Sequence, residues 1–275
     1  MVASSSADYI IFRDFLEDAC GIILGDNKQY LVSSRLNKLL AQEGISNLKE
    51  LVQRMQQVSR RGLKERVIDA MTTNETLWFR DSHPFEIFKN KIIPELQKER
   101  SGSLRIWSAA CSSGQEPYSL SMMLEEYRVE NMGGLRSSVE IVATDLSRTM
   151  LERCKSAEYD GLSLGRGLSN ERLKRFFEPT VDDMWRVKPE VRQRVRFQAL
   201  NLMDSFSLLG KFDCVFCRNV LIYFSAELKM DILRRIHSAL RPGGYLVLGG
   251  SEGLSGFKEY YEMVQCHPGI IYRAI

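Results

Sequence analysis

The sequence predicts an α/β protein with a doubly wound, mostly parallel sheet, preceded by a small all-α domain and interrupted by a small inserted β subdomain. Three observations support this fold class. Residues 1–71 carry apolar side chains at helical spacing. From about residue 100, short apolar runs alternate with helical segments, which is typical of parallel strands joined by right-handed crossovers. Two late apolar runs are separated by the short turn His267–Pro268–Gly269, which predicts an antiparallel terminal strand at the sheet edge.

The N-terminal domain, residues 1–71, is expected to contain four short helices packed as a bundle. Asn47 precedes the third helical segment and is a favourable N-cap residue. The four expected apolar faces are Ile11, Phe12, Phe15 and Ala19; Leu36, Leu39 and Leu40; Leu48, Leu51, Val52 and Met55; and Leu63, Val67, Ile68 and Met71.

Residues 72–99 are expected to link this domain to the main domain, residues 100–275. Strands of the main domain are expected at Leu104–Ala109, Val139–Asp145, Val195–Leu200, Phe212–Arg218, Tyr245–Gly249, Glu262–Cys266 and Ile270–Arg273. The helical segments between them are Tyr118–Tyr127, Arg148–Cys154 and Leu228–Leu240.

One connection is too long for a simple crossover, at about 40 residues before the third strand. We expect a β subdomain inserted at about residues 160–194, with a helix at Glu171–Phe177 and a hairpin that turns at Asp182–Asp183. Loose surface decoration is the alternative, and the aromatic residues Phe176, Phe177 and Trp185 favour a packed unit or a binding surface.

Composition limits the class of protein. The chain has 275 residues, of which 44% are hydrophobic and 27% charged, as expected for a folded globule. Its net charge of +3 is too small to indicate binding to nucleic acid or an anionic membrane. No apolar run approaches the roughly 20 residues of a membrane span, and the N-terminus does not resemble a secretion signal. We therefore expect a cytoplasmic protein that does not insert into a membrane.

The six cysteines are too sparse for a disulfide framework and suit a reducing compartment. Cys214 and Cys217 have C-x-x-C spacing but lie in an expected strand. Residues three apart on a strand face opposite sides, so this pair does not predict a metal site, and none is expected elsewhere.

Basic residues gather in part of the helical domain, where Lys28, Arg35 and Lys38 lie in a stretch without acids. A solvated helix face explains this pattern, and so does a docking surface for an acidic partner.

The segment RIWSAACSSGQEPYS, residues 105–119, reads as a first strand, a loop and a helix start, where α/β folds bind ligands. It has a single glycine, Gly114, and the carboxylate of Glu116 would repel a phosphate. A cofactor with an ammonium group and no phosphate, such as S-adenosylmethionine, fits better than a dinucleotide. The alternative is a tight turn in an ordinary α/β domain.

Polar residues also follow the other expected strands. Asp145 ends the second strand, where this fold bonds ribose hydroxyls; the alternative is an N-cap of the next helix. Asn201 and Leu202 follow the third strand, and an amide beside an apolar side chain suits adenine. The fourth strand leads to Arg218, Asn219 and Tyr223. It lacks the Asn/Asp-Pro-Pro-aromatic motif of base methylation and a Pro-Cys nucleophile, which weighs against a nucleic-acid substrate.

These motifs together resemble the CheR-type chemotaxis receptor methyltransferases, which form glutamyl methyl esters. The resemblance covers nearly the whole chain and rests on TTNETLWFR (72–80), WSAACSSGQEPYS (107–119), ATDLS (143–147), LNL (200–202), FDCVFCRNVLIYF (212–224) and GGSE (249–252). It implies a methyltransferase fold, and cofactor contacts at Asn74, Thr76, Arg80, Glu116, Asp145, Asn201, Leu202, Arg218 and Asn219. Arg80 and Tyr223 are the residues that it places nearest the reactive methyl group.

The implied chemistry agrees with the residues present. A glutamate carboxylate is ionised at neutral pH, so it attacks a sulfonium methyl group without a general base. His83, His237 and His267 accordingly carry no acid–base motif. Arg80 holds the substrate carboxylate or serves only the cofactor, and Tyr223 orients Arg80 or packs on the cofactor.

The resemblance also implies partners. The substrate is the cytoplasmic helical region of a chemoreceptor, docked through Arg35 and Lys38, with S-adenosylhomocysteine as the second product. The basic stripe is short, since Leu39, Leu40 and Ala41 interrupt it, and TVDDMWRV shows no peptide-gripping pattern, so an obligatory receptor tail is not expected. We expect a monomer and leave open a regulatory protein partner. The competing hypotheses are a cofactor-binding sensor without turnover and an RNA methyltransferase.

Overall fold

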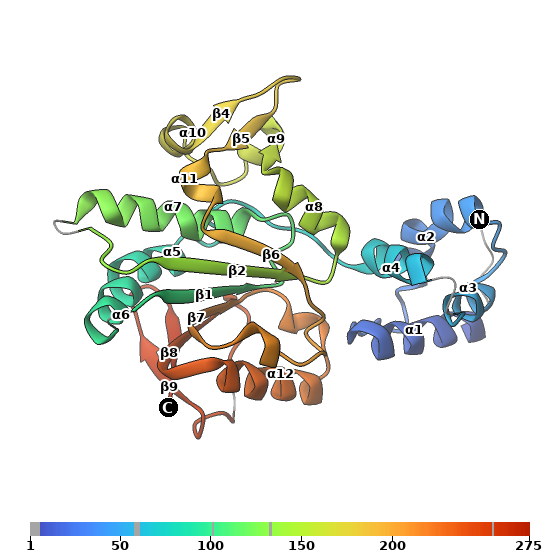
Figure 1. Cartoon of the computed structure of the whole chain (residues 1–275). Coiled ribbons are helices and arrows are strands. Elements are labelled where there is room, and N and C mark those ends of the chain that lie inside the picture. Colours follow the sequence, from blue (N-terminus) through green and yellow to red (C-terminus); the bar gives the residue numbers. More distant parts are fainter. Residues whose placement is uncertain (1–5, 58–60, 101, 132–133, 255) are drawn as a thin grey trace.

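A computed structural model of the chain describes residues 6–57, 61–100, 102–131, 134–254 and 256–275. A helical N-terminal domain lies beside an α/β domain, and a small inserted sheet lies on the far side of helices α7 and α8 (Figure 1). No helix in these described ranges is long and apolar enough to span a membrane.

The helical domain consists of α1 (Ser6–Cys20), α2 (Gln29–Glu43), α3 (Leu48–Met55) and α4 (Arg61–Met71), which share one apolar core. Gly44 ends α2 in a left-handed conformation, with φ of +61°. Asn47 caps α3, accepting a hydrogen bond from the Glu50 N–H at 2.8 Å. The apolar faces predicted for α2, α3 and α4 are buried.

The predicted face of α1 was partly wrong. Its buried side chains are Tyr9, Phe12, Leu16 and Cys20, whereas Ile11 is 38% exposed. Both sets satisfy helical spacing, so local periodicity alone does not choose between them. In the folded domain the set with Tyr9 packs into the core, and the Tyr9 hydroxyl donates to the Gly25 carbonyl at 2.6 Å.

The main sheet has seven strands in the order β6-β2-β1-β7-β8-β10-β9. The strands are β1 (Leu104–Ala109), β2 (Val139–Asp145), β6 (Val195–Ala199), β7 (Phe212–Cys217), β8 (Leu240–Leu248), β9 (Tyr261–Gln265) and β10 (Ile270–Ala274). All pairs are parallel except β8–β10 and β9–β10, which confirms the predicted antiparallel terminal strand. The winding direction reverses between β1 and β7, which is where such sheets bind ligands.

Strand β8 begins earlier than predicted. Phe212 pairs with Leu240 but Cys214 pairs with Tyr245, so residues 241–244 bulge against Asp213. Pro242, Gly243 and Gly244 thus lie inside an irregular start of this strand.

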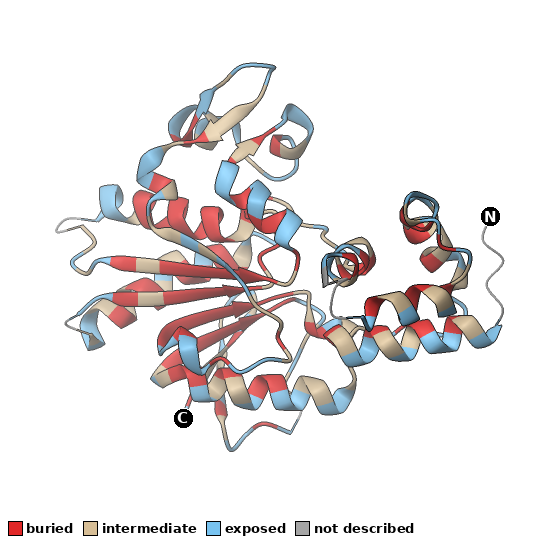
Figure 2. Cartoon of the chain, turned by 45° about the vertical axis from the view of Figure 1, so that its right-hand side comes forward, coloured by how far each residue is buried: buried red, intermediate tan, exposed pale blue. Residues whose placement is uncertain are grey.

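Helices cover both faces of the sheet, and buried residues concentrate in its strands (Figure 2). One core includes residues of α5 (His83–Ile87), η2 (Phe88–Ile92), α6 (Ile93–Glu99) and α7 (Gln115–Glu130); the other includes α12 (Ala226–Ala239). Cys214 lies in the first core and Cys217 in the second, so they face opposite sides as predicted.

The inserted segment follows α8 (Arg148–Ser156) and forms a three-stranded antiparallel sheet in the order β3-β5-β4. It comprises β3 (Glu158–Tyr159), α9 (Gly161–Leu164), α10 (Asn170–Phe176), β4 (Phe177–Pro179), β5 (Trp185–Val187) and α11 (Pro189–Arg192). Asp182 and Asp183 both have positive φ, 58° and 56°, as a tight hairpin turn requires. Phe176 and Phe177 are each 2% exposed, so the segment is a packed unit and not loose decoration.

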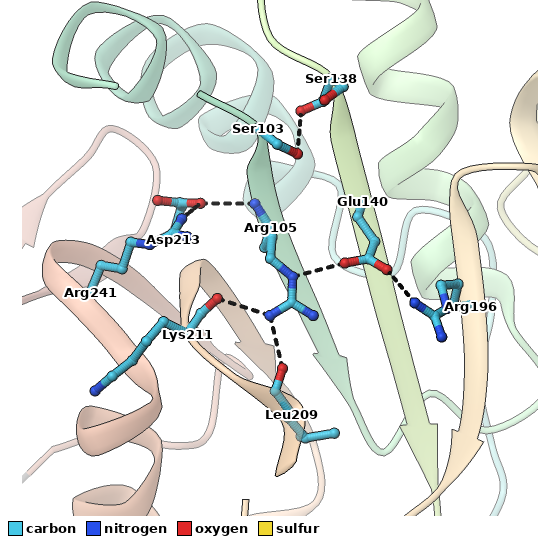
Figure 3. Close-up of polar contacts among 9 residues, drawn as sticks. All are labelled: Ser103, Arg105, Ser138, Glu140, Arg196, Leu209, Lys211, Asp213 and Arg241. Carbon is cyan, nitrogen blue, oxygen red and sulfur yellow. Dashed lines mark hydrogen bonds and ion pairs between the residues drawn. The ribbon is translucent and has the colours of Figure 1, made fainter. Parts of the chain in front are cut away.

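A network of charges joins the amino ends of the strands (Figure 3). Arg105 on β1 binds Glu140 on β2 at 2.8 Å, and Glu140 also binds Arg196 on β6 at 3.0 Å. The fully buried Asp213 on β7 accepts from the Arg105 N–H at 2.8 Å and from Arg241 at 2.6 Å. These bonds hold the strands in register at the edge opposite the ligand-binding edge.

Candidate functional site

A cavity of about 340 Å³ lies at the carboxyl ends of the strands, between the helical domain and the sheet. This volume is within the range of small-molecule sites. Nearly all the residues predicted for the site line it: Arg35, Asn74, Thr76, Arg80, Glu116, Asp145, Asn201, Leu202, Arg218, Asn219 and Tyr223. Lys38 does not line it and is exposed on the outer surface of α2.

The loop after β1 is shaped by three residues with positive φ: Ala110 (60°), Ser112 (50°) and Gly114 (93°). A Cβ atom at Gly114 would lie 3.0 Å from both Cys154 Sγ and the Tyr159 hydroxyl, so this position favours glycine for conformation and for space. The loop then enters α7, whose first turn carries Glu116.

Glu116 and Arg218 form the buried charge pair of the site. Arg218 Nη1 lies 3.1 Å from one carboxylate oxygen of Glu116, and Ser108 Oγ donates to the other at 2.8 Å. Burial raises the pKa of the Glu116 carboxyl, and the nearby Arg218 charge opposes that rise. The Glu116 side chain keeps 12% exposure, on a residue that lines the cavity.

Asp145 ends β2 and joins two loops. One carboxylate oxygen accepts from the Ser112 N–H at 2.7 Å and the other from the Ser147 N–H at 2.8 Å. Burial raises its pKa, although these bonds act in the opposite direction. Ser147, whose hydroxyl accepts from the Met150 N–H, is the N-cap of α8. The alternative that Asp145 caps this helix is therefore excluded.

Arg80 lies in a backbone segment of unusual conformation. Phe79, Asp81 and Ser82 have φ values of 49°, 66° and 49°. Arg218 fixes this segment, because its Nη2 donates to the Arg80 carbonyl at 2.9 Å and to Asp81 at 2.7 Å. Within the described residues, the Arg80 guanidinium has a single hydrogen bond, 3.3 Å long, to the Glu75 carbonyl. Most of its donors therefore stay available to a ligand.

The inserted subdomain also supports this segment, which the sequence did not reveal. The Trp78 ring, fully buried, packs edge-on against Tyr159 and Phe177, with centroids 4.8 Å and 5.3 Å away. Gly167 lies so close that a Cβ atom there would be 2.1 Å from the Trp78 carbonyl oxygen. Arg172, paired with Glu126, lies over the Phe79 ring.

Tyr159 also reaches the loop after β1, where its hydroxyl donates to the Ser113 carbonyl at 2.7 Å. The subdomain therefore contacts both the segment of Arg80 and the loop before Glu116. Only the aromatic content of the insertion hinted at such contacts.

The amide of Asn201 is engaged within the protein. Its nitrogen donates to the Ala19 carbonyl at 3.0 Å, and its oxygen accepts from the Met203 N–H at 3.1 Å. The side chain thus joins the loop after β6 to the end of α1, and it also lines the cavity. Leu202 is 6% exposed and forms an apolar part of the wall.

Arg35 binds the joint between the two domains, and Tyr223 connects the domains directly. Arg35 points inward, donating to the carbonyls of Met71 and Thr72 at 2.5 Å and 3.1 Å and to Thr73 Oγ1 at 3.1 Å. The Tyr223 carbonyl accepts from the Ile23 N–H at 3.0 Å. Sequence reasoning missed the cavity wall formed by Ile22, Ile23, Leu24 and Lys28, because the turn after α1 carries no recognisable motif.

The donor set is compatible with S-adenosylmethionine. Glu116 is a partly desolvated carboxylate on the cavity wall, where an ammonium group could bind, and Asp145 is a second carboxylate on that wall, at the end of β2, where this fold commonly bonds ribose hydroxyls. Among the residues that the structure describes, no cluster of three His, Cys, Asp or Glu side chains is arranged to hold a metal ion.

Comparison with known proteins agrees with this geometry. Residues 7–72 match the family described as "CheR methyltransferase, all-alpha domain", and residues 74–270 match "CheR methyltransferase, SAM binding domain". A protein named chemotaxis protein methyltransferase 1 from Pseudomonas aeruginosa is 63% identical over 274 residues, which cover 99% of this chain and 100% of the relative. Chemotaxis protein methyltransferase Cher2 of Pseudomonas putida is 62% identical with the same coverage. The chemotaxis protein methyltransferase of Escherichia coli is 31% identical over 95% of this chain and 90% of its own length.

Proposed function

The chain belongs to the CheR methyltransferase family, and on this premise we propose that it is a protein-glutamate O-methyltransferase. It is an S-adenosylmethionine-dependent methyltransferase of chemotaxis. The proposed reaction methylates glutamate side chains in the cytoplasmic helical region of chemoreceptors and leaves S-adenosylhomocysteine.

The observation that carries the proposal is the unequal use of two arginines in one cavity. Arg218 is buried and its charge is committed to Glu116 and Asp81. Arg80 is only half-buried and has one long hydrogen bond, so its guanidinium remains able to hold a carboxylate in two parallel bonds. A carboxylate substrate matches this arrangement better than a neutral amine or a phosphate ester beside Glu116.

Bound S-adenosylmethionine supplies an electrophilic methyl group. In the proposed site Glu116 holds its ammonium group and Asp145 its ribose, with Asn74, Thr76, Arg80, Asn201, Leu202, Arg218 and Asn219 as further contacts. Arg80 orients the substrate carboxylate, and Tyr223 orients Arg80 or packs on the cofactor. The substrate glutamate is already ionised near neutral pH, so the protein contributes orientation rather than a general base. Among the described residues that line the cavity there is no histidine.

Receptor docking is proposed for the outer face of α2, where Lys38 is exposed. Arg35 is engaged with the joint between the domains, so its contribution to docking is indirect. We further propose that the protein acts in the cytoplasm as a monomer, without nucleic acid or a metal ion.

The test uses methyl-labelled S-adenosylmethionine with receptor-containing membranes, scoring label that mild base releases as methanol. Base-labile label on the receptor, lost in Arg80→Ala, is the expected result. Base-stable label on the receptor would contradict ester formation. Cofactor binding without transfer to receptor would favour the sensor hypothesis, and transfer to RNA would favour the RNA methyltransferase.

A further inference from the structure

A carboxylate beside the site binds four backbone N–H groups. Glu252 Oε2 accepts from Asn219 at 2.7 Å and from Gly249 at 2.9 Å, and Oε1 accepts from Val220 at 3.1 Å and from Leu221 at 2.8 Å. Three of these donors belong to the loop that follows β7. Both oxygens are therefore fully used within the protein.

The fold explains how Glu252 reaches this loop. β7 and β8 are parallel neighbours, with Cys217 paired to Leu248, so the segments that follow them leave the sheet side by side. The Glu252 N–H donates to the Gly249 carbonyl at 2.9 Å, which closes a tight turn and returns the side chain toward β7. A Cβ atom at Gly249 would lie 2.7 Å from Glu252 Oε2 and 2.9 Å from the Asn219 nitrogen, so glycine is required for this approach.

The bound loop carries site residues in an irregular conformation. Asn219 has a φ of 58°, in the left-handed region that Asn tolerates better than most residues with a side chain. Leu221–Tyr223 then form the short helix η4, which places Tyr223 in the cavity wall. Converging N–H groups repel one another unless an anion accepts them, and a carboxylate does so with charge-assisted bonds.

We infer that Glu252 is a positioning residue of the methyl-transfer site: its carboxylate fixes the Asn219–Tyr223 loop and thereby the place of Tyr223. This inference deepens the proposed function and rests on it for its kinetic consequences. Glu252 does not line the cavity, so its effect is transmitted through the backbone that it binds.

Amide exchange on the unmodified protein tests the geometry without any variant. The N–H groups of Asn219, Val220, Leu221 and Gly249 are expected to exchange slowly, with or without S-adenosylhomocysteine. Exchange at unprotected rates would overturn the inference. Because this measurement needs no turnover, it is independent of whether receptor glutamates are the substrate.

Steady-state kinetics tests whether Glu252 affects methyl transfer. Glu252→Gln replaces one accepting oxygen by a donor, and we expect kcat per folded molecule to fall about tenfold or more, with a smaller change in affinity for S-adenosylhomocysteine. Glu259→Gln, which removes the same charge from an exposed position, is the matched control and should keep full activity.

A double-mutant cycle separates positioning from general stabilisation. In a Tyr223→Phe background, Glu252→Gln should lower kcat by a smaller factor than in the wild type, because both changes act on one loop. Fully additive losses, or an unchanged kcat per folded molecule with only a lower Tm, would contradict the inference. If Glu252→Gln does not fold, Glu252→Asp, which keeps the charge, takes its place in the same cycle.

Discussion

Two arginines of the site illustrate how residues of one type take different roles. Arg218 has a side chain that is 1% exposed and holds Glu116, Asp81 and the Arg80 carbonyl together. Arg80 is held through its backbone carbonyl and lines the cavity, and its guanidinium has one long hydrogen bond, to the Glu75 carbonyl. The first arginine therefore builds the site, and the second is available to the substrate.

Replacing Arg80 tests this division. Arg80→Ala should lower kcat about a hundredfold, because the substrate carboxylate loses its orientation, and should weaken S-adenosylhomocysteine binding by about tenfold at most. Arg80→Lys should recover little, since an ammonium group does not offer two parallel donors. Steady-state kinetics and calorimetry provide the comparison. Equal losses in both quantities would mean that Arg80 is only a cofactor ligand.

In the proposed site, Glu116 should make ligand binding depend on pH. Burial raises its pKa, and its protonated form cannot pair with the ammonium group of the ligand. Affinity for S-adenosylhomocysteine should therefore fall as the pH is lowered through this raised pKa. Glu116→Gln should bind more weakly at neutral pH, and the gap in affinity between wild type and variant should narrow on acidification. A constant gap, measured by calorimetry across the range, would remove Glu116 from ligand binding.

The stability of the ligand-free protein should change with pH in the opposite direction to its ligand affinity. Because the folded state binds this proton more tightly than the unfolded chain, the free energy of unfolding decreases as pH rises from the ordinary value of 4.5 through the raised pKa. The free energy of unfolding in urea should be compared between the wild type and Glu116→Gln at each pH. Their difference isolates the contribution of Glu116 from that of Asp145, whose pKa is also raised.

At the scale of elements, the inserted sheet supports the segment that carries Arg80. The contacts are the Trp78 ring between Tyr159 and Phe177, the Arg166 carbonyl that accepts from the Trp78 N–H at 3.0 Å, and the close approach of Gly167. A substitution that pushes Gly167 away from Trp78 should therefore alter the shape of the cavity, although Gly167 itself lies outside the cavity.

Two glycines of the insertion make a matched pair for this test. Gly167→Ala combines a φ of 95° with a Cβ position 2.1 Å from a backbone oxygen, so it should cost about 1–3 kcal/mol and also weaken S-adenosylhomocysteine binding. Gly161→Ala meets nothing within 4 Å and lies in α9, so stability and affinity should stay nearly unchanged. Thermal unfolding and calorimetry of both variants check this. Unchanged affinity in a folded Gly167→Ala would show that the insertion does not support the site.

The elements also show where sequence reasoning succeeds. Strands of the main sheet were predictable because apolar runs and their carboxyl-end residues, such as Asp145 and Arg218, are local signals. The two-residue strand β3 is too short to show an alternating pattern of apolar and polar residues, so it could not be predicted. The ion pair between Glu75 and Arg166 joins residues 91 apart, and no local pattern indicates such a partner.

The direction in which individual side chains point also could not be predicted from the sequence. The pattern placed Arg35 on a basic face, whereas the structure turns it toward the Met71 and Thr72 carbonyls at the joint between the domains. Asn201 was predicted to meet adenine, which stays a prediction, and the structure adds bonds from its amide to Ala19 and Met203 that the sequence did not indicate. Both outcomes depend on how the two domains meet, which is set by tertiary packing.

At the scale of the molecule, the cavity belongs to both domains. Asn201 bonds to the end of α1, Ile23 bonds to Tyr223, and Arg35 bonds to the joint between the domains.

The two basic residues of α2 should therefore respond differently to substitution, because Arg35 points toward the joint and Lys38 toward solvent. Lys38→Ala should raise the KM for receptor and leave S-adenosylhomocysteine affinity unchanged, with a defect that shrinks as salt rises. Arg35→Ala should weaken cofactor binding as well. The docking proposal fails if Lys38→Ala methylates receptor at the wild-type rate at low salt.

The wall that residues 22–25 add to the cavity has an evolutionary consequence. In the proposed docking mode, a lineage that adapts to new receptors can vary the outer face of α2 around Lys38. It cannot vary the inner positions in the same way, because each change there alters the chamber that every substrate shares. Under this proposal, sequences of relatives should diverge rapidly on the outer face of α2 and stay constant at the positions that line the cavity.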